Sequence, residues 1–185
     1  MRLVHTFCEE IMKKFIIALV FLIGSVYIVD RLPNVTYSPL PKSKPTPVEQ
    51  FMDRIASIET PGGTHRTVNR FGMMGRYQFS PSTVRVLGFR VSQREFLNNK
   101  HVQDTVMLRY MRVNSRELSW YIKRYDGKVV NGVKITRAGI LAGAHFAGSE
   151  GVKSFFRDGS NRTDANGTTV AKYMSKFSNF NLPEI

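Results

Sequence analysis

The chain is almost free of cysteine. Its 185 residues include a single one, Cys8, which precedes the first long apolar run. One thiol forms no intramolecular disulfide and does not make a cysteine metal site. Dinucleotide-binding and phosphate-loop glycine motifs are missing as well. The sequence therefore excludes a disulfide-stapled fold, and we expect neither a metal ion nor a cofactor.

Acidic residues are also scarce. The chain has 14 Asp and Glu against 27 Lys and Arg, a formal net charge of +13. The first thirty residues contribute nothing to this surplus, because their three basic and three acidic side chains cancel. An excess of positive charge favours a polyanionic partner such as nucleic acid, an anionic membrane surface or a cell-wall polymer. A basic soluble protein without such a partner remains an alternative.

Long apolar runs are limited to one, FIIALVFLIGSVYIV at residues 15–29, which follows Lys13 and Lys14. A basic flank before an apolar run is typical of a signal peptide or an uncleaved signal anchor. The run is shorter than the roughly 20 residues that a membrane-spanning helix prefers, yet no small-x-small cleavage site follows it. We predict an N-terminal membrane anchor or signal segment over residues 1–30. A buried core helix is the alternative.

A proline-rich stretch separates this segment from the rest of the chain. Residues 31–47 hold five prolines and few large apolar side chains, a composition that is typical of an extended linker. The stretch ends in a helix-start pattern, with Thr46 as the N-cap, Pro47 at the first helical position and Glu49 three residues after the cap. The folded domain is therefore predicted over residues 48–185. Because an anchor or signal segment precedes it, we expect the domain outside the cytoplasm, facing the periplasm or cell wall, either anchored to the inner membrane or secreted.

Helical patterns dominate this domain. Apolar residues recur at spacings of three and four from Val48 to Ile58, which predicts an amphipathic helix that ends at Pro61-Gly62-Gly63. Further elements are a helix from Ser80-Pro81, a helix from Ser92, a long helix over 100–125, a hairpin over 129–135, a helix from Thr136 through Phe146 and a helix from Thr168 through Phe177. The predicted fold class is mainly α with a small β-hairpin.

One carboxylate occupies an unusual place in this pattern. The stretch IETPGGTHRTVNRFGMMGRYQF at 58–79 has Glu59 as its only acidic residue, and Glu59 lies four residues after Ile55 on the apolar helical face. Such a position disfavours the charged form of the carboxyl group, and a general acid acting near neutral pH needs that environment. The alternative is a helix-terminal glutamate that turns into water, which position alone would favour.

Three short segments resemble the lysozyme-like superfamily of peptidoglycan-cleaving enzymes, specifically lytic transglycosylases and phage-type muramidases. In that superfamily a helix ends in a catalytic glutamate, usually followed by serine and glycine, and IETPGG at 58–63 is similar. A glycine-x-x-glutamine segment lines the sugar groove, and GRYQ at 75–78 matches it. AHFAG at 144–148 looks like the later alanine-tyrosine-asparagine-alanine-glycine segment. DANGT at 164–168 is similar to the tail of some phage relatives, so that the resemblance covers about residues 48–178.

The resemblance implies an α+β lysozyme-like fold and cleavage of the β-1,4 bond between N-acetylmuramic acid and N-acetylglucosamine. Glu59 would be the catalytic acid. The substrate-binding residues it implies are Thr60, Gly75, Tyr77, Gln78, His145 and Phe146. Gln78 would position the acetamido group, Tyr77 would stack on a sugar ring, and the backbone at Gly75 would let the glycan approach closely.

The segments also depart from the family pattern. Thr60 replaces the usual serine. His145 replaces a tyrosine that would reach the catalytic carboxylate, and we expect that it can form a hydrogen bond there; core packing is the alternative. Phe146 replaces an asparagine, which removes a polar contact to the sugar. No second acid is evident near Glu59, and Asp164 has no predicted location. The lack of an evident second acid favours a transglycosylase, which forms 1,6-anhydro products, over a hydrolytic muramidase.

Other functional classes remain open. A domain with a degenerate site would be a non-catalytic cell-wall or envelope-assembly protein. A basic helical module that binds nucleic acid is a further alternative, but we expect no nucleic acid partner, because the apolar segment would tether the domain at a membrane. The partners we expect are peptidoglycan glycan strands and, through residues 1–30, a membrane. A role in an envelope-spanning machine that needs a local opening in the wall is a hypothesis that fits a short anchored domain.

Overall fold

The computed structural model describes residues 43–62, 64–164 and 167–185. The described part forms one folded unit, Lys44–Ile185. The predicted anchor, residues 1–30, and residues 31–42 of the predicted linker lie outside the described residues. No helix within the described ranges is long and apolar enough to cross a membrane.

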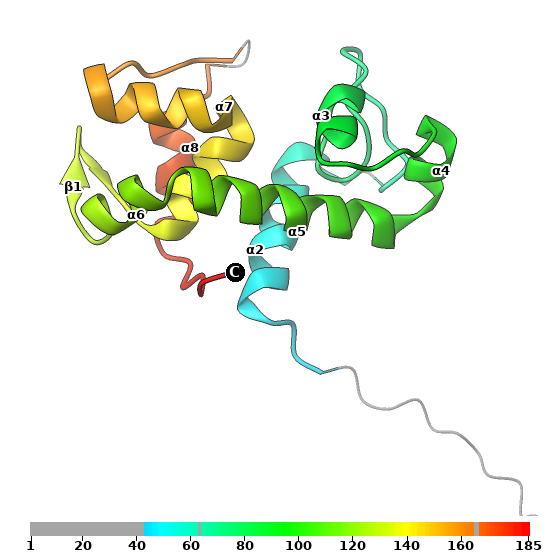
Figure 1. Ribbon diagram of the computed structural model, residues 1–185, viewed down its shortest axis with the longest axis horizontal. Helices are drawn as coiled ribbons and strands as arrows, with labels where there is room; N and C mark the ends of the chain where they lie inside the picture. Colours follow the sequence, from blue (N-terminus) through cyan, green and yellow to red (C-terminus); the bar gives the residue numbers. More distant parts are fainter. Residues whose placement is uncertain (1–42, 63, 165–166) are drawn as a thin grey trace, which may run out of the picture. The chain divides into compact units, whose positions relative to one another are not determined.

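The folded unit is mainly helical, with one small antiparallel hairpin (Figure 1). Its elements in chain order are α2 (Pro47–Glu59), α3 (Pro81–Val86), α4 (Gln93–Asn98), α5 (Lys100–Glu117), α6 (Ser119–Tyr125), β1 (Val129–Val130), β2 (Val133–Lys134), α7 (Arg137–Asp158) and α8 (Val170–Lys176). This confirms the predicted fold class at the level of secondary structure.

The capping signals place most helix starts correctly. Thr46 and Glu49 form a capping box at the start of α2, in which the Thr46 hydroxyl accepts from the Glu49 N–H and the Glu49 carboxylate accepts from the Thr46 N–H. Ser92 forms the same motif with Glu95 at α4, and the Ser80 side chain caps α3. Each motif satisfies backbone donors that the first helical turn leaves unpaired.

Three boundaries differ from the prediction. The long helix expected over 100–125 is divided at Leu118, which ends α5 and starts α6. The helix expected to end at Phe146 is interrupted close to that point by Gly148, with φ 72° and ψ 168°, and a second helical stretch that was not predicted continues α7 to Asp158. The last helix is capped by Thr169 in place of Thr168. Leu118 is fully buried, so tertiary packing holds the break there.

The hairpin forms around the predicted turn. Val130 pairs with Val133, and the two turn residues Asn131 and Gly132 have φ values of 49° and 76°. Positive φ at both central positions defines a type I′ turn, whose twist matches that of the flanking strands.

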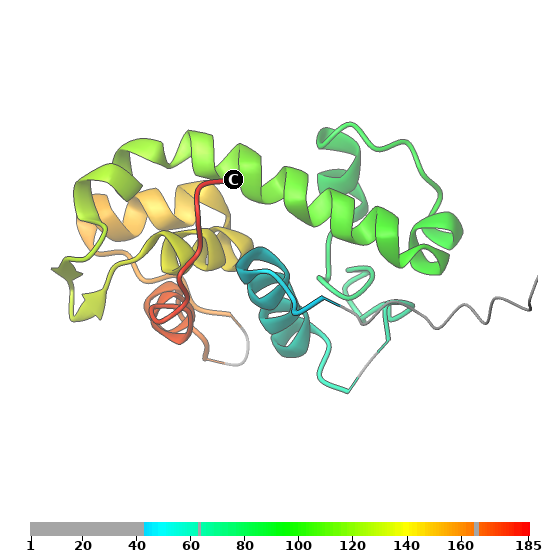
Figure 2. The same cartoon turned by 90° about the horizontal axis from the view of Figure 1, so that it is seen from below.

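Helix α5 spans the domain (Figures 1 and 2). Helices α3 and α4 lie at one end of it, while α6, the hairpin, α7 and α8 gather at the other, and α2 crosses near the middle. Two buried apolar clusters follow this division. One is built on α2, α5 and the segment between them and also includes residues of α7 and α8 such as Leu141 and Tyr173, and the second is built on α6, the hairpin, α7 and α8. Phe146 packs against both clusters.

The segment between α2 and α3 is folded tightly on itself. Met74 forms β-bridges to Val68 and to Phe79. Gly75 has φ 73°, and a Cβ atom there would collide with the side chain of Gln103. Gln103 is fully buried, accepts from the Arg76 N–H at 2.9 Å and donates to the carbonyls of His65 and Phe96, each at 2.8 Å. Gly75 is therefore required twice, for its backbone angle and for its contact with α5.

We predict that Gly75→Ala lowers the free energy of unfolding of residues 44–185 by about 2–5 kcal/mol, because a left-handed backbone strain and an overpacked contact add up. Gly127→Ala is the matched control, since Gly127 has φ 79° but no atom near the added Cβ. Its expected loss is about 1–2 kcal/mol. Urea unfolding measures both variants, and equal losses would contradict the contact with Gln103.

Candidate active site

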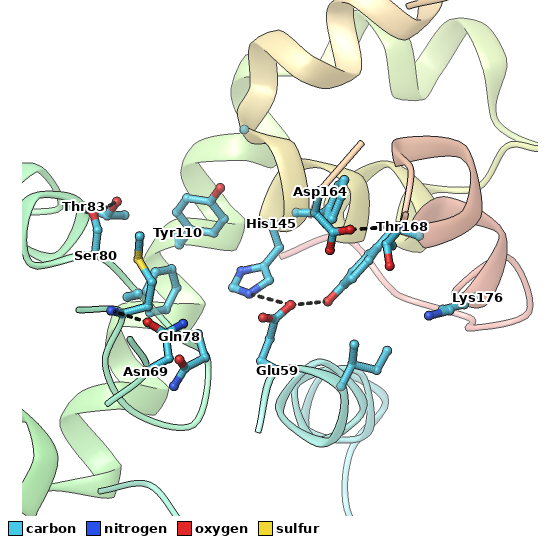
Figure 3. A pocket seen from close by; sticks show the side chains of 16 residues that line it. Glu59, Asn69, Gln78, Ser80, Thr83, Tyr110, His145, Asp164, Thr168 and Lys176 are labelled. Atoms are coloured by element: carbon cyan, nitrogen blue, oxygen red, sulfur yellow. Dashed lines mark hydrogen bonds and ion pairs between the residues drawn. The ribbon is translucent and has the colours of Figure 1, made fainter. Parts of the chain in front are cut away.

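A cleft of about 660 Å³ opens between the two ends of the domain, within the size range of small-molecule sites. Glu59 lies between its two walls (Figure 3). One wall comes from the segment before α3, from the start of α3 and from α5, and the other from α7, α8 and the residues before α8. The lining residues are Ile58, Glu59, Asn69, Met73, Gln78, Phe79, Ser80, Thr83, Tyr110, His145, Phe146, Gly148, Asp164, Thr168, Tyr173 and Lys176.

Glu59 is the last residue of α2, whose buried face includes Phe51 and Ile55. That face orients the end of the helix toward the cleft. The Glu59 side chain keeps 24% of its surface exposed. It is therefore accessible to a ligand while much of its hydration is removed.

Tyr173 holds one oxygen of this carboxylate. Its hydroxyl donates a hydrogen bond of 2.6 Å to Glu59 Oε1, across 114 positions of sequence (Figure 3). Burial first, then the Glu59 charge and the hydrogen bond to it, raise the pKa of Tyr173 far above its ordinary value. Tyr173 thus stays protonated and remains a donor at any working pH. Within the described residues Oε2 has no hydrogen bond, so it is the oxygen available to a ligand.

A stack of aromatic rings fixes Tyr173. Phe146 lies 5.1 Å from it at 22°, and Phe177 lies 5.7 Å from it at 20°. Phe177 in turn packs edge-on against Phe51 of α2 at 5.2 Å. The donor therefore has little rotational freedom, and its position relative to Glu59 is set by the core.

His145 lies at the back of the cleft. Its side chain is only 5% exposed, and its Nε2 lies 3.8 Å from Glu59 Oε1. This distance is beyond hydrogen-bonding range, which corrects the expectation that His145 bonds directly to the carboxylate; Tyr173 has that role. The ring packs edge-on against Phe79 at 5.4 Å and Tyr110 at 5.9 Å.

The His145 ring is also incompletely satisfied. Its Nδ1 is buried and has no hydrogen-bond partner. Burial lowers the pKa of His145, while the nearby Glu59 charge and the Tyr77 backbone act in the opposite direction. The ring is consequently neutral near pH 7 and adds no positive charge beside Glu59.

Gln78 enters the cleft through an uncommon backbone conformation. Its φ is 51°, a left-handed angle that few residues other than glycine adopt. Its side-chain amide donates to the Gly75 carbonyl at 2.7 Å, which leaves its amide oxygen as an acceptor. Gln78 thus lines the cleft, as the resemblance implied.

Tyr77, the residue before it, points the other way. Its ring is 1% exposed and its hydroxyl donates to Asp104 at 2.7 Å. The expectation that Tyr77 stacks on a sugar is therefore wrong, because the ring belongs to the core behind the segment. Arg76 supports the same region, pairing with Asp53 at 2.5 Å and with Asp104 at 3.3 Å.

Thr60 and Gly75 also lie behind the cleft. Thr60 is buried, and its hydroxyl donates to the Arg76 carbonyl at 3.1 Å. It thereby joins the end of α2 to the segment that carries Gln78. Neither Thr60 nor Gly75 lines the cleft. Of the seven site residues expected from sequence, the structure gathers four in the cleft, namely Glu59, Gln78, His145 and Phe146.

Several lining residues were not identified from sequence. Tyr173 and Tyr110 come from helices whose apolar pattern predicts core positions, and the Tyr110 hydroxyl donates to the Ala144 carbonyl at 2.7 Å. The resemblance of the tail before α8 was the one signal that pointed to Tyr173. Asp164 lines the cleft from the turn before α8, where its Oδ1 accepts from the Thr168 N–H at 2.8 Å. A second carboxylate therefore borders the same cleft as Glu59.

Comparisons of the chain with models of known families, with curated proteins and with solved structures give no match. Within the described residues, no group of three or more His, Cys, Asp and Glu side chains is arranged to hold a metal ion.

We predict that the Tyr173 hydrogen bond is stronger to a charged partner than to a neutral one. Tyr173→Phe should lower the free energy of unfolding by about 1.5–3 kcal/mol in the wild type but by only about 1 kcal/mol when Glu59 is already Gln. Unfolding of the two single variants and the double variant gives the coupling. An equal cost in both backgrounds would contradict a direct bond to the carboxylate.

We predict that His145 makes the free energy of unfolding depend on pH below about pH 6.5, the ordinary pKa of histidine. Because the folded pKa of His145 is lowered, the unfolded chain binds the proton first, and stability falls as the pH drops below that value. The slope is at most about 1.4 kcal/mol per pH unit. In His145→Gln this contribution should vanish between pH 7 and 5.5. His65 and His101 are present in both proteins, so identical slopes would refute the assignment.

Proposed function

We propose that the domain has a lysozyme-like fold and cleaves peptidoglycan at the β-1,4 bond between N-acetylmuramic acid and N-acetylglucosamine, as a lytic transglycosylase. The observation that carries the proposal is the environment of the Glu59 carboxylate. This half-buried carboxylate borders an open cleft, with Oε1 held by Tyr173 and Oε2 facing the ligand space. The sequence resemblance at 58–63, 75–78 and 144–148 supplies the reaction class.

The chemistry of the cleft supports a carbohydrate ligand. Neutral hydrogen-bonding side chains such as Asn69, Gln78 and Thr83 suit hydroxyl and acetamido groups, while Tyr110 and Phe146 offer apolar surface to the C–H faces of sugar rings. Few charges line it. Such a mixture of apolar walls and a few oriented polar groups is what a specific small-molecule site requires.

The arrangement of Glu59 defines its part in the reaction. Since Oε1 accepts from Tyr173, the proton of the neutral acid resides on Oε2, which donates it to the glycosidic oxygen as the bond to the anomeric carbon breaks. The carboxylate then accepts the proton of the muramic C6 hydroxyl. The C6 oxygen closes on the anomeric carbon and gives a 1,6-anhydro end without consuming water. The neutral His145 places no positive charge beside the carboxylate.

Asp164 supports a second candidate, a hydrolytic muramidase. A hydrolase places a second carboxylate beside the scissile bond, where it activates water or stabilises the oxocarbenium-like centre. Asp164 lines the cleft, so the apparent lack of a second acid no longer favours the transglycosylase. We retain the transglycosylase as the first candidate because Asp164 is exposed and one of its carboxylate oxygens already accepts a hydrogen bond from the Thr168 N–H.

The test is mass spectrometry of fragments released from purified peptidoglycan by residues 44–185. Glu59→Gln should reduce release by at least about a hundredfold, the size expected for the loss of general acid catalysis. Glu184→Gln is the matched control, because Glu184 is an exposed carboxylate outside the cleft and its loss should leave release unchanged. Release by Glu59→Gln at the wild-type rate would sink the catalytic assignment.

The same spectra separate the two candidates. Muropeptides lighter by one water than hydrolysis products, still formed by Asp164→Asn, would support the transglycosylase. Reducing ends that disappear in Asp164→Asn would establish the muramidase. No release by the folded wild type from several kinds of wall would favour the non-catalytic envelope-assembly alternative.

We further propose that residues 1–30 anchor the domain so that it faces the wall. A short enzyme on a proline-rich linker would then act near its own membrane, as an envelope-spanning machine that needs a local opening in the wall would require.

A further inference from the structure

An aromatic cluster lies on the surface at α6, away from the cleft. It consists of Trp120, Tyr121 and Tyr125 of α6 and Phe156 of α7, and we call it the α6 patch. Trp120 is 60% exposed, and Val129 on the adjoining hairpin is 71% exposed. The other three rings are half-buried. Large exposed aromatic side chains that gather in one place mark an interaction surface.

The rings of the patch are packed mainly on one another. Tyr125 and Phe156 stack with their centroids 4.6 Å apart at 8°, and Tyr121 stacks on Phe156 at 5.2 Å. Trp120 meets Tyr121 edge-on at 5.0 Å. A sugar ring stacks on a free aromatic face, and these mutual stacks occupy several of the faces. The three half-buried rings therefore cover one another's faces, while the exposed indole of Trp120 offers an apolar body with a polar N–H.

Positive charge predominates on the side of the patch formed by α6 and the hairpin. Residues 119–134 hold four Lys and Arg against one acidic residue. Lys123 and Arg124 follow Trp120 at helical spacings of three and four, which places them beside it on α6. Both are exposed, and the described part of the chain provides no ion pair for either. The acidic residue, Asp126, accepts from the Arg137 N–H.

Indole and phenol rings flanked by lysine and arginine are suited to the headgroup region of a bilayer. There, tyrosine and tryptophan keep their apolar bodies in contact with acyl chains and their polar atoms in water, while each nearby cation is attracted to anionic lipid. The folded unit as a whole contains 22 Lys and Arg against 11 Asp and Glu, so charge complementarity favours an anionic surface.

The length of chain before the domain permits this contact. Fourteen residues separate the apolar run at 15–29 from Lys44, a reach of at most ~45 Å at about 3.1 Å per extended residue. A domain of this size is roughly 37 Å across. If residues 1–30 are the anchor proposed above, the domain can lie against the bilayer with either end toward it.

We propose that the α6 patch docks the domain onto an anionic lipid bilayer, as a second membrane contact besides the N-terminal segment. Docking through α6 would orient the cleft at a fixed angle to the membrane. The inference is independent of the cleavage reaction, because none of the patch residues lines the cleft.

The test exploits Trp120, the one tryptophan of the chain. Residues 44–185, which contain both apolar clusters of the fold, are mixed with vesicles of phosphatidylcholine, with and without phosphatidylglycerol. We expect cosedimentation and a blue shift of the tryptophan emission with the anionic vesicles, both weakened by salt. Glu59→Gln should bind vesicles like the wild type, which separates this result from the test of cleavage.

Two double variants locate the contact. Lys123→Glu with Arg124→Glu should weaken binding to anionic vesicles by at least about tenfold. Arg85→Glu with Arg90→Glu is the matched control and should weaken it much less. It makes the same change of charge on exposed residues of α3 and of the segment between α3 and α4, which lie at the end of the domain away from α6. Trp120→Ser, followed by cosedimentation, should lower binding by about tenfold through loss of apolar contact.

Several outcomes would overturn the proposal. Equal losses of vesicle binding in the two double variants would mean that net charge alone, and not the α6 patch, accounts for the binding. An unchanged tryptophan emission in vesicle-bound protein would place the contact elsewhere. Retained vesicle binding by Trp120→Ser, together with its loss of binding to soluble wall glycans, would make the patch a glycan site. Self-association abolished by Trp120→Ser, without lipid binding, would make it an interface between copies.

Discussion

The hydrogen bond between Tyr173 and Glu59 joins the last helix of the domain to the end of the first. The geometry of the cleft depends on it, because it determines which carboxylate oxygen faces a ligand. Its strength comes from the packing around it. Phe146 and Phe177 hold the phenol between them, and Phe177 contacts Phe51 on the same helix that ends in Glu59. Donor and acceptor are thus positioned by one shared core, the preorganisation that a reactive site needs.

The opposite wall is held from behind by a second buried network. Gln103 of α5 fixes the backbone at Arg76, and Thr60 joins that backbone to the end of α2. Tyr77 faces Asp104 in the core, whereas Gln78, with its left-handed backbone, directs its own side chain toward the cleft. Two adjacent residues therefore serve opposite sides of one segment, one supporting it and the other facing the ligand space.

Local signals in the sequence predicted most of the helices, because capping boxes such as Thr46 with Glu49 and turns such as Asn131-Gly132 act within a few residues. Features set by distant packing were missed. No local signal near Leu118 marks the break, which coincides with a side chain fully buried by the rest of the fold. The same holds for the site. Glu59 and Gln78 were found through short motifs, whereas the partner of Glu59 comes from 114 residues away, and Tyr77 was misassigned because a single positive φ decides which neighbour enters the cleft.

The central claim is that Glu59 acts on a glycan held between the two walls. A crystal structure of the Glu59→Gln variant with an uncleaved peptidoglycan oligomer tests it most directly. The account predicts sugar rings between Gln78 and α8, with a glycosidic oxygen within hydrogen-bonding distance of the side chain at position 59 on the side away from Tyr173. An oligomer bound elsewhere on the domain, or in the cleft with its glycosidic oxygens out of reach of residue 59, would contradict it.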